Sequence, residues 1–173
     1  DFARSFLGNL GLEEGDSILA IHPGSGSPAK NWSPENFARV AEGMSRRAKV
    51  LLISGPANDG IEEVKRRLKE ANPFVAENLP LLQLAALLQR STAYLGNDSG
   101  ITHLAAALGL PTVAIFGPTD PAIWSPPGPR VQILYEKPSC PPCSSEARSG
   151  CSRHCLERIE PKRVLEILST LFK

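Results

Sequence analysis

Hydrophobic residues along the chain fall into short uninterrupted runs, each closed by glycine, proline or polar residues. Runs of β-branched and apolar residues of this length are typical of β-strands. They are apolar at every position rather than at alternate ones, which indicates strands covered on both faces, as in a parallel sheet between helices. The predicted strands span residues 17–21, 49–54, 74–75, 91–95, 112–116 and 131–135.

Between these runs, apolar residues recur every three or four positions, which is the spacing of one helix face. One helix is also marked at its start, because Ser33 suits an N-cap and Pro34 suits the first helical position. Strands and helices alternate over residues 17–173, which predicts one α/β domain, a Rossmann-like parallel sheet sandwiched by helices. The predicted helices span residues 34–44, 61–71, 81–88, 101–108 and 161–171, and residues 1–16 form a short leading helix or linker.

The composition is that of an ordinary globular domain. Of the 173 residues, 42% are hydrophobic and 21% are charged, and the formal net charge of +1 does not indicate nucleic acid or an anionic membrane as a partner. No apolar run approaches the length of a membrane-spanning helix, and we recognise no signal peptide. The sequence starts at Asp1 without a methionine, so we expect a piece of a longer protein.

Three of the predicted strands end in loops that carry phosphate- and hydroxyl-binding groups. Loops that follow parallel strands gather at one edge of the sheet, where ligands bind. A helix that starts there presents backbone N–H groups and the positive end of its dipole, which favour an anion. The candidate ligand-binding residues are Ser25, Ser27 and Lys30 in the first loop, Asn58 and Asp59 in the second, and Asp98, Ser99, Gly100 and His103 in the third.

Each of these residues also has an ordinary structural interpretation. Asp98 or Ser99 suits a helix N-cap, and Asp59 lies three residues before a glutamate, the spacing of a capping box. Lys30 belongs to a residue type that is mostly exposed, and His103 suits a core histidine on an apolar helix face. The ligand-binding hypothesis is preferred because three separate loops agree on one site.

The glycine-rich first loop does not fit the familiar nucleotide-binding motifs. Residues 24–29 match G-x-G-x-x-A, but Pro28 and Trp32 stand before the next helix opens. Ser54 and Gly55 occupy the place after the second strand where an acidic residue is expected, and a Walker loop is absent. Neither NAD nor FAD is therefore expected.

Two segments carry a specific resemblance to a known family. Residues 98–107 read D-S-G-x-x-H-x-A-A-A and residues 116–121 read F-G-P-T-D-P, accompanied by H-P-G at 22–24 and K-N-W at 30–32. From about Ser17 onward, the chain resembles the carboxy-terminal half of glycosyltransferase family 9, the ADP-heptose:lipopolysaccharide heptosyltransferases. This resemblance implies the GT-B architecture, in which two Rossmann-like domains face each other across a cleft. The N-terminal acceptor domain, with its catalytic aspartate base, is then expected to lie outside this sequence.

The resemblance assigns the nucleotide-sugar donor to all three loops. Its inverting chemistry displaces a nucleoside diphosphate, and Lys30 with the helix start at Ser99 would neutralise the charge that develops on this leaving group. The reaction requires no cofactor. The expected contacts are Ser25, Ser27 and Lys30 with the diphosphate, Asp98 with the sugar, Ser99, Gly100 and His103 at the phosphate end of the helix, Asp59 with the ribose, and Leu79 with the adenine.

For the whole enzyme, the resemblance implies transfer of heptose from ADP-heptose to the inner core of lipopolysaccharide. The enzyme would work at the cytoplasmic face of the inner membrane, with peripheral membrane association, and its lipid-linked acceptor would bind through the other domain. This chain alone is expected to bind the donor without turning it over. Two alternatives stay open: a GT-B-type nucleotide-sugar epimerase, and a non-catalytic nucleotide- or metal-binding interaction module.

A separate feature is a cysteine-rich loop at residues 138–156. Its four cysteines are close enough to hold one Zn²⁺, with His154 as a further ligand, although their spacing is not that of a standard zinc finger. Disulfides, disfavoured in a cytosolic chain, and free thiols are the other interpretations. The candidate metal ligands are Cys140, Cys143, Cys151 and Cys155.

Overall fold

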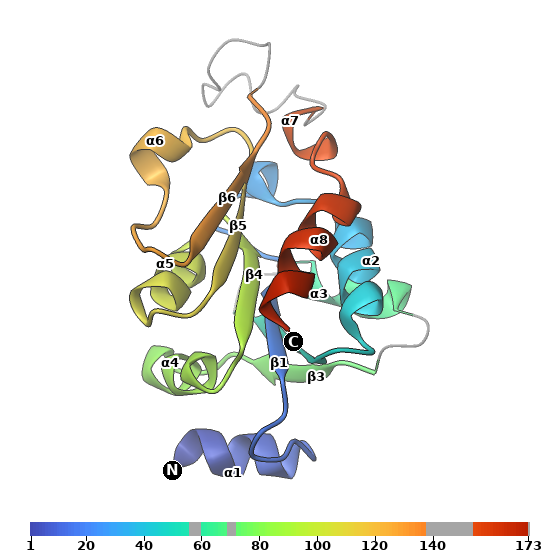
Figure 1. The fold of residues 1–173 in the computed structure, drawn as a ribbon, viewed down its shortest axis with the longest axis vertical. Helices are drawn as coiled ribbons and strands as arrows, with labels where there is room; N and C mark the ends of the chain where they lie inside the picture. Colours follow the sequence, from blue (N-terminus) through green and yellow to red (C-terminus); the bar gives the residue numbers. More distant parts are fainter. Residues whose placement is uncertain (56–59, 69–71, 138–153, 173) are drawn as a thin grey trace.

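The computed structural model describes residues 1–55, 60–68, 72–137 and 154–172, and in them six parallel strands form one sheet (Figure 1). The strand order is β3-β2-β1-β4-β5-β6. The predicted fold, a Rossmann-like parallel sheet between helices, is confirmed. The strands are β1 (Ile18–His22), β2 (Lys49–Ser54), β3 (Phe74–Glu77), β4 (Ala93–Asn97), β5 (Thr112–Phe116) and β6 (Val131–Tyr135).

The centre of the sheet is buried on both faces, as the uninterrupted apolar runs predict. Every residue of β1, β4 and β5 is buried. β1 lies between β2 and β4, so Ile21 is in register with Leu52 on one side and with Leu95 on the other. Because successive side chains of a strand point to opposite faces, Leu19 packs into one core cluster and Ala20 into another.

Helices cover both faces of the sheet with their apolar stripes (Figure 1). The longer helices are α1 (Phe2–Asn9), α2 (Pro34–Met44), α3 (Ile61–Arg67), α4 (Leu81–Gln89), α5 (Gly100–Ala107) and α8 (Pro161–Leu171). Helices α2, α3 and α8 share a core cluster with Leu19 on one face. On the other face, α1 and α4 pack around Ile18, and α4 and α5 pack around Ala20. Within the described residues, no helix has the length and apolar character needed to cross a membrane.

Short helical turns flank the longer elements and were not predicted. They are η1 (Pro28–Lys30) after β1, α6 (Pro121–Trp124) after β5, and α7 (His154–Glu157) before α8. The predicted start of α2 is confirmed, because the Ser33 side chain accepts a hydrogen bond from the Asn36 N–H.

Several predicted boundaries are wrong. β4 runs to Asn97, so Gly96 and Asn97 belong to the strand rather than to the turn after it. Glycine is required at position 96, because a Cβ there would lie 2.3 Å from the Tyr94 hydroxyl oxygen. The N-cap of α3 is Gly60, whose φ of 80° suits glycine, and not Asp59 as the capping-box spacing predicts. α3 also ends at Arg67, short of residue 71.

The strand order places the carboxyl ends of β1 and β4 next to each other, with His22 in register with Gly96. The chain leaves β1 toward α2 on one face of the sheet and leaves β4 toward α5 on the other. Loops that diverge in this way leave a crevice at the edge of the sheet, the usual ligand-binding position in this type of fold. The loops after β1 and β4, which carry Lys30 and Asp98, therefore border one crevice.

Candidate functional site

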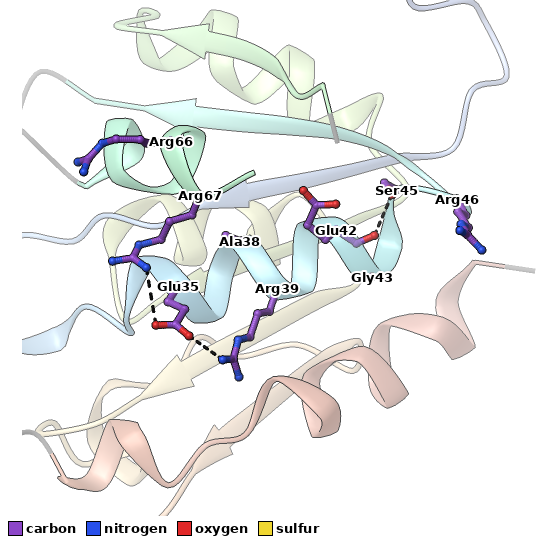
Figure 2. Close-up of a pocket in the computed structure, with 9 residues that line it drawn as sticks. All are labelled: Glu35, Ala38, Arg39, Glu42, Gly43, Ser45, Arg46, Arg66 and Arg67. Carbon is purple, nitrogen blue, oxygen red and sulfur yellow. Dashed lines mark hydrogen bonds and ion pairs between the residues drawn. The ribbon is translucent and has the colours of Figure 1, made fainter. Parts of the chain in front are cut away.

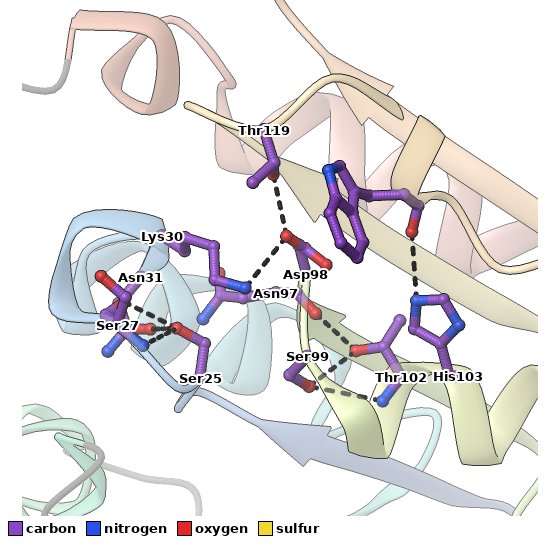
Figure 3. A network of polar contacts seen from close by, with 11 residues as sticks. Ser25, Ser27, Lys30, Asn31, Asn97, Asp98, Ser99, Thr102, His103 and Thr119 are labelled. Atoms are coloured by element: carbon purple, nitrogen blue, oxygen red, sulfur yellow. Dashed lines mark hydrogen bonds and ion pairs between the residues drawn. The ribbon is translucent and has the colours of Figure 1, made fainter. Parts of the chain in front are cut away.

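Lys30 and Asp98 meet at this crevice (Figure 3). They are 68 positions apart in sequence, and Lys30 Nζ lies 3.1 Å from Asp98 Oδ2. The Asp98 side chain is 8% exposed and the Lys30 side chain 20%, so water reaches the pair only in part. The Thr119 hydroxyl, from the loop after β5, donates to the same carboxylate oxygen at 2.8 Å. Three loops thus converge on Asp98.

The loop that carries Lys30 is held at both of its ends by Asn97, the last residue of β4. Asn97 is completely buried. Its Nδ2 donates to the Pro23 carbonyl at 2.7 Å, and its Oδ1 accepts from the Trp32 N–H at 2.9 Å. The indole N–H of Trp32 donates in turn to the Ile159 carbonyl at 3.1 Å, so the end of the loop is also tied to the segment before α8.

Ser25 is engaged inside this loop. Its single hydroxyl proton faces two acceptors, the Ser27 carbonyl at 2.7 Å and Asn31 Oδ1 at 2.6 Å. Its oxygen accepts the Ser27 N–H at 3.2 Å. The Ser25 hydroxyl therefore shapes the loop and has no further proton to donate to a ligand in this conformation. Diphosphate contacts from Ser25 and Ser27 stay a prediction.

A cluster of hydroxyl groups fixes the start of α5. Ser99 is the N-cap, and its Oγ accepts from the Thr102 N–H. Thr102 Oγ1 donates to the Asn97 carbonyl at 2.5 Å and lies 3.1 Å from both Ser99 Oγ and Tyr94 Oη. Because Thr102 uses its one proton on Asn97, Ser99 and Tyr94 are the donors in those two contacts. The Ser99 hydroxyl thus points inward, and anion binding here would rest on backbone N–H groups such as that of Gly100, which have no intrahelical acceptor.

Burial keeps Tyr94 neutral. Desolvation raises the pKa of its phenol well above the ordinary value, and the hydrogen bonds with Thr102 and Ser99 oppose this shift only in part. The neutral phenol retains the proton that it donates to Thr102. The hydroxyl cluster is therefore uncharged, unlike the neighbouring Lys30–Asp98 pair.

His103 reaches from α5 to the segment after β5. Its Nε2 lies 3.1 Å from the Trp124 carbonyl (Figure 3). Since a carbonyl only accepts, Nε2 carries a proton in this contact. Asp120 caps α6 by accepting the Ala122 N–H at 2.9 Å. The α6 segment is thus tied to predicted site residues through Thr119 and through Trp124.

A small apolar pocket of about 140 Å³ opens at the same edge of the sheet. Leu79, the residue expected against the adenine, lines it together with Ile53 and Ile101. The backbone of Asn78 is in the left-handed region, with φ of 51°, at the bend that leads into Leu79. Asp59, the expected ribose contact, lies outside the described residues.

A wider depression of about 950 Å³ lies along α2 and α3 (Figure 2). Its charged lining residues are Arg39, Arg46, Arg66, Arg67, Glu35 and Glu42. Glu35 pairs with Arg39 at 2.6 Å and with Arg67 at 3.7 Å, and all three side chains are about half exposed. Exposed pairs of this kind contribute about 0–1 kcal/mol to stability. No predicted site residue lines this depression, and we do not assign the site to it.

The cysteine-rich loop lies almost entirely outside the described residues. Cys140, Cys143 and Cys151 are not described, and Cys155 is buried in the core cluster beneath α8. In the part of the chain that the structure describes, no group of three or more potential ligands could hold a metal ion. The zinc hypothesis for this loop stays a prediction.

The structure adds three polar residues that the sequence interpretation did not single out: Asn97, Thr102 and Thr119. Asn97 and Thr102 lie within or beside the segment at 98–107, and Thr119 lies in F-G-P-T-D-P. Because these segments carry the resemblance to a known family, their polar residues could have been added to the candidate site from the sequence. Their partners, however, come from other loops, which local sequence does not reveal.

One family matches most of this sequence. The model of glycosyltransferase family 9 (heptosyltransferase) matches residues 3–152. The chain belongs to glycosyltransferase family 9. The segments that carry the sequence resemblance, 98–107 and 116–121, also contain Asp98 and Thr119, which meet at the crevice.

Three proteins of this kind resemble the chain over nearly its whole length. It is 30% identical to lipooligosaccharide heptosyltransferase 2 of Campylobacter jejuni subsp. jejuni, over 99% of this chain and 56% of that protein. The family 9 glycosyltransferase of Veillonella parvula has a TM-score of 0.85 and 28% identity, over 98% of this chain and 50% of that one. E. coli ADP-heptose lipopolysaccharide heptosyltransferase II has a TM-score of 0.80 and 26% identity, over 99% of this chain and 51% of that one. The chain therefore spans about half the length of these relatives.

Proposed function

We propose that this family 9 chain is the donor-binding half of an inverting glycosyltransferase that transfers heptose from ADP-heptose to the inner core of lipopolysaccharide. The observation that carries the proposal is the contact between Lys30 and Asp98 at the crevice between β1 and β4. It brings together a cation suited to a diphosphate and a carboxylate suited to sugar hydroxyls.

The diphosphate would bind between Lys30 and the start of α5. A lysine ammonium has three protons, and the contact with Asp98 uses one of them, so two remain for phosphate oxygens. The backbone N–H of Gly100 and the helix dipole would add positive potential from the start of α5. When the bond between sugar and diphosphate breaks, negative charge grows on the diphosphate, and these groups would stabilise it.

Asp98 would bind the sugar of the donor. Lys30 and Thr119 both contact Oδ2, so the carboxylate is held in place by one of its oxygens. The other oxygen, Oδ1, is then suited to accept a hydrogen bond from a hydroxyl group of the sugar. The adenine would enter the apolar pocket against Leu79 and Ile101.

The remaining steps are assigned to the half of the enzyme that lies outside this sequence. A carboxylate there would act as the base that deprotonates the acceptor hydroxyl, and the acceptor would be a lipid-linked lipopolysaccharide precursor. The proposed reaction needs no cofactor, because Lys30 and α5 supply the positive charge. We place the full enzyme at the cytoplasmic face of the inner membrane, where such an acceptor is anchored.

Calorimetry of the chain with ADP, UDP, GDP and ADP-heptose tests this proposal. We expect adenine nucleotides to bind most tightly. Lys30→Ala should weaken ADP binding roughly tenfold or more, because hydrogen bonds to charged groups contribute about 1.5–3 kcal/mol. Lys49→Ala, an exposed position at the amino end of β2, removes the same charge away from the crevice and should leave affinity unchanged. The proposal fails if no nucleotide binds or if both variants bind like the unmodified chain.

A further inference from the structure

The Asn97 side chain joins the two halves of the candidate site. Its amide is completely buried and bonds to both ends of the loop between residues 23 and 32, through the Pro23 carbonyl and the Trp32 N–H. This loop carries Lys30, whereas the residue next to Asn97 is Asp98, the partner of Lys30. One side chain thus sets the position of the cation relative to the strand that presents the carboxylate.

Only a carboxamide matches these two contacts at this size. The Pro23 carbonyl needs a donor and the Trp32 N–H needs an acceptor, and the asparagine side chain offers one of each. A carboxylate at this position would keep the acceptor but would face the Pro23 carbonyl with a second oxygen. An aliphatic side chain would leave both backbone groups buried without a partner, which costs more than a hydrogen bond contributes.

We propose that Asn97 is a positioning residue for the donor diphosphate, acting through the loop that it closes. It does not contact the donor; it holds the backbone from which Lys30 reaches the crevice. Trp32 supports the same geometry from the other side, because its indole N–H bonds to the Ile159 carbonyl while its ring packs edge-on against Phe37. This inference rests on the proposed function, since it concerns the affinity for a diphosphate.

The test compares Asn97→Asp with the unmodified chain in calorimetry with ADP and with adenosine. At pH 8 we expect the variant to bind ADP at least about tenfold more weakly, whereas adenosine, which has no phosphate, is bound equally by both proteins. A general loss of folding would weaken both ligands together. Equal ADP affinity at pH 8 for the unmodified chain, Asn97→Asp and Asn97→Leu would overturn the inference, because leucine can neither donate to Pro23 nor accept from Trp32 at any pH.

The pH dependence of this variant gives a second, more specific readout. A protonated aspartic acid can donate to the Pro23 carbonyl and still accept from Trp32, so the ratio of variant to unmodified affinity should rise toward one as the pH falls to 5.5. The unmodified chain, measured at each pH, corrects for the nearby titratable groups His22, Lys30, Asp98 and His103 and for the phosphate itself. Asn97→Leu cannot recover in this way, and Asn9→Asp, on the exposed end of α1, should match the unmodified chain throughout. A ratio that does not rise for Asn97→Asp would contradict the proposed role.

Amide hydrogen exchange without ligand separates this inference from the proposed function. In Asn97→Asp at pH 8, exchange should accelerate at the Trp32 N–H and within residues 24–32 while the strands keep their protection. Unchanged exchange in this loop would overturn the positioning role even if no nucleotide binds. Faster exchange in a chain that binds no ADP would instead support the loop closure and reject the donor-binding function.

Discussion

At the scale of single residues, the start of α5 is held by hydroxyl groups whose protons are all donated within the protein. Thr102 accepts from two hydroxyl groups and donates to the Asn97 carbonyl, which fixes the direction of every proton in the cluster. The buried phenol of Tyr94 closes this cluster over Gly96, where no other residue leaves room for it. Small polar residues beside the crevice therefore determine the shape of the backbone as much as they offer groups to a ligand.

Tyr94 also makes stability depend on alkaline pH. Its pKa in the folded protein is raised above the ordinary value of 10.0, so the folded state keeps a proton that the unfolded chain loses first. The contribution is complete below pH 10 and is lost as pH rises above it, by up to about 1.4 kcal/mol per pH unit. Urea unfolding at pH 8 and pH 11 should show a smaller loss of stability in Tyr94→Phe than in the unmodified chain. Equal losses in the two proteins would mean that Tyr94 ionises normally when folded.

At the scale of secondary-structure elements, two helices start with the same device but at different places. Ser33 caps α2 and Ser99 caps α5, each accepting from the N–H three residues later. Only the start of α5 lies at the crevice beside Asp98. Variants of the two caps can therefore be compared: both should lose helix stability, but only a variant of the α5 cap should also lose ligand affinity.

Ser33→Ala and Ser99→Ala should each lower the free energy of unfolding by about 1 kcal/mol, because each leaves one backbone N–H without its acceptor. Ser99→Ala should in addition weaken ADP binding, since the first turn of α5 frays where the phosphates are expected. Chemical denaturation and calorimetry on the same two variants measure both effects. If Ser33→Ala weakens ADP binding to the same extent, loss of stability alone explains the result, and α5 has no special role.

At the scale of the whole molecule, the two tryptophans report on how distant segments assemble. Trp32 is 1% exposed, because its indole reaches Ile159, which is 127 positions further along the chain. Trp124, on α6, is 57% exposed. One indole thus depends on the complete fold, and the other does not.

Iodide should therefore quench only part of the tryptophan fluorescence of the folded chain. Trp124→Phe should abolish most of this quenching and leave a blue-shifted emission from Trp32. Trp32→Phe should retain the quenching, because the exposed Trp124 is still present. In denaturant, both indoles should become accessible. Strong quenching of Trp124→Phe under native conditions would show that the loop after β1 is not closed against the segment before α8.

Local sequence was sufficient for most elements because burial on both faces and helical spacing are properties of neighbouring residues. The apolar runs predicted the strands, and Ser33 with Pro34 predicted the start of α2. Boundaries were wrong where a distant contact decides them. Gly96 and Asn97 look like turn residues, yet they remain in β4 because Tyr94 covers the glycine and the amide of Asn97 bonds to the Pro23 carbonyl and the Trp32 N–H.

The sequence by itself thus determined the fold class, the family and the loops that carry candidate donor-binding groups. Only the tertiary structure decided which of those groups meet. The order of strands in the sheet is not encoded in the periodicity of any one strand, and that order brings Lys30 and Asp98 together across 68 positions. The closure of the Lys30 loop by Asn97 follows from the same arrangement, because β4 must lie beside β1 before one buried amide can bond to both ends of the loop.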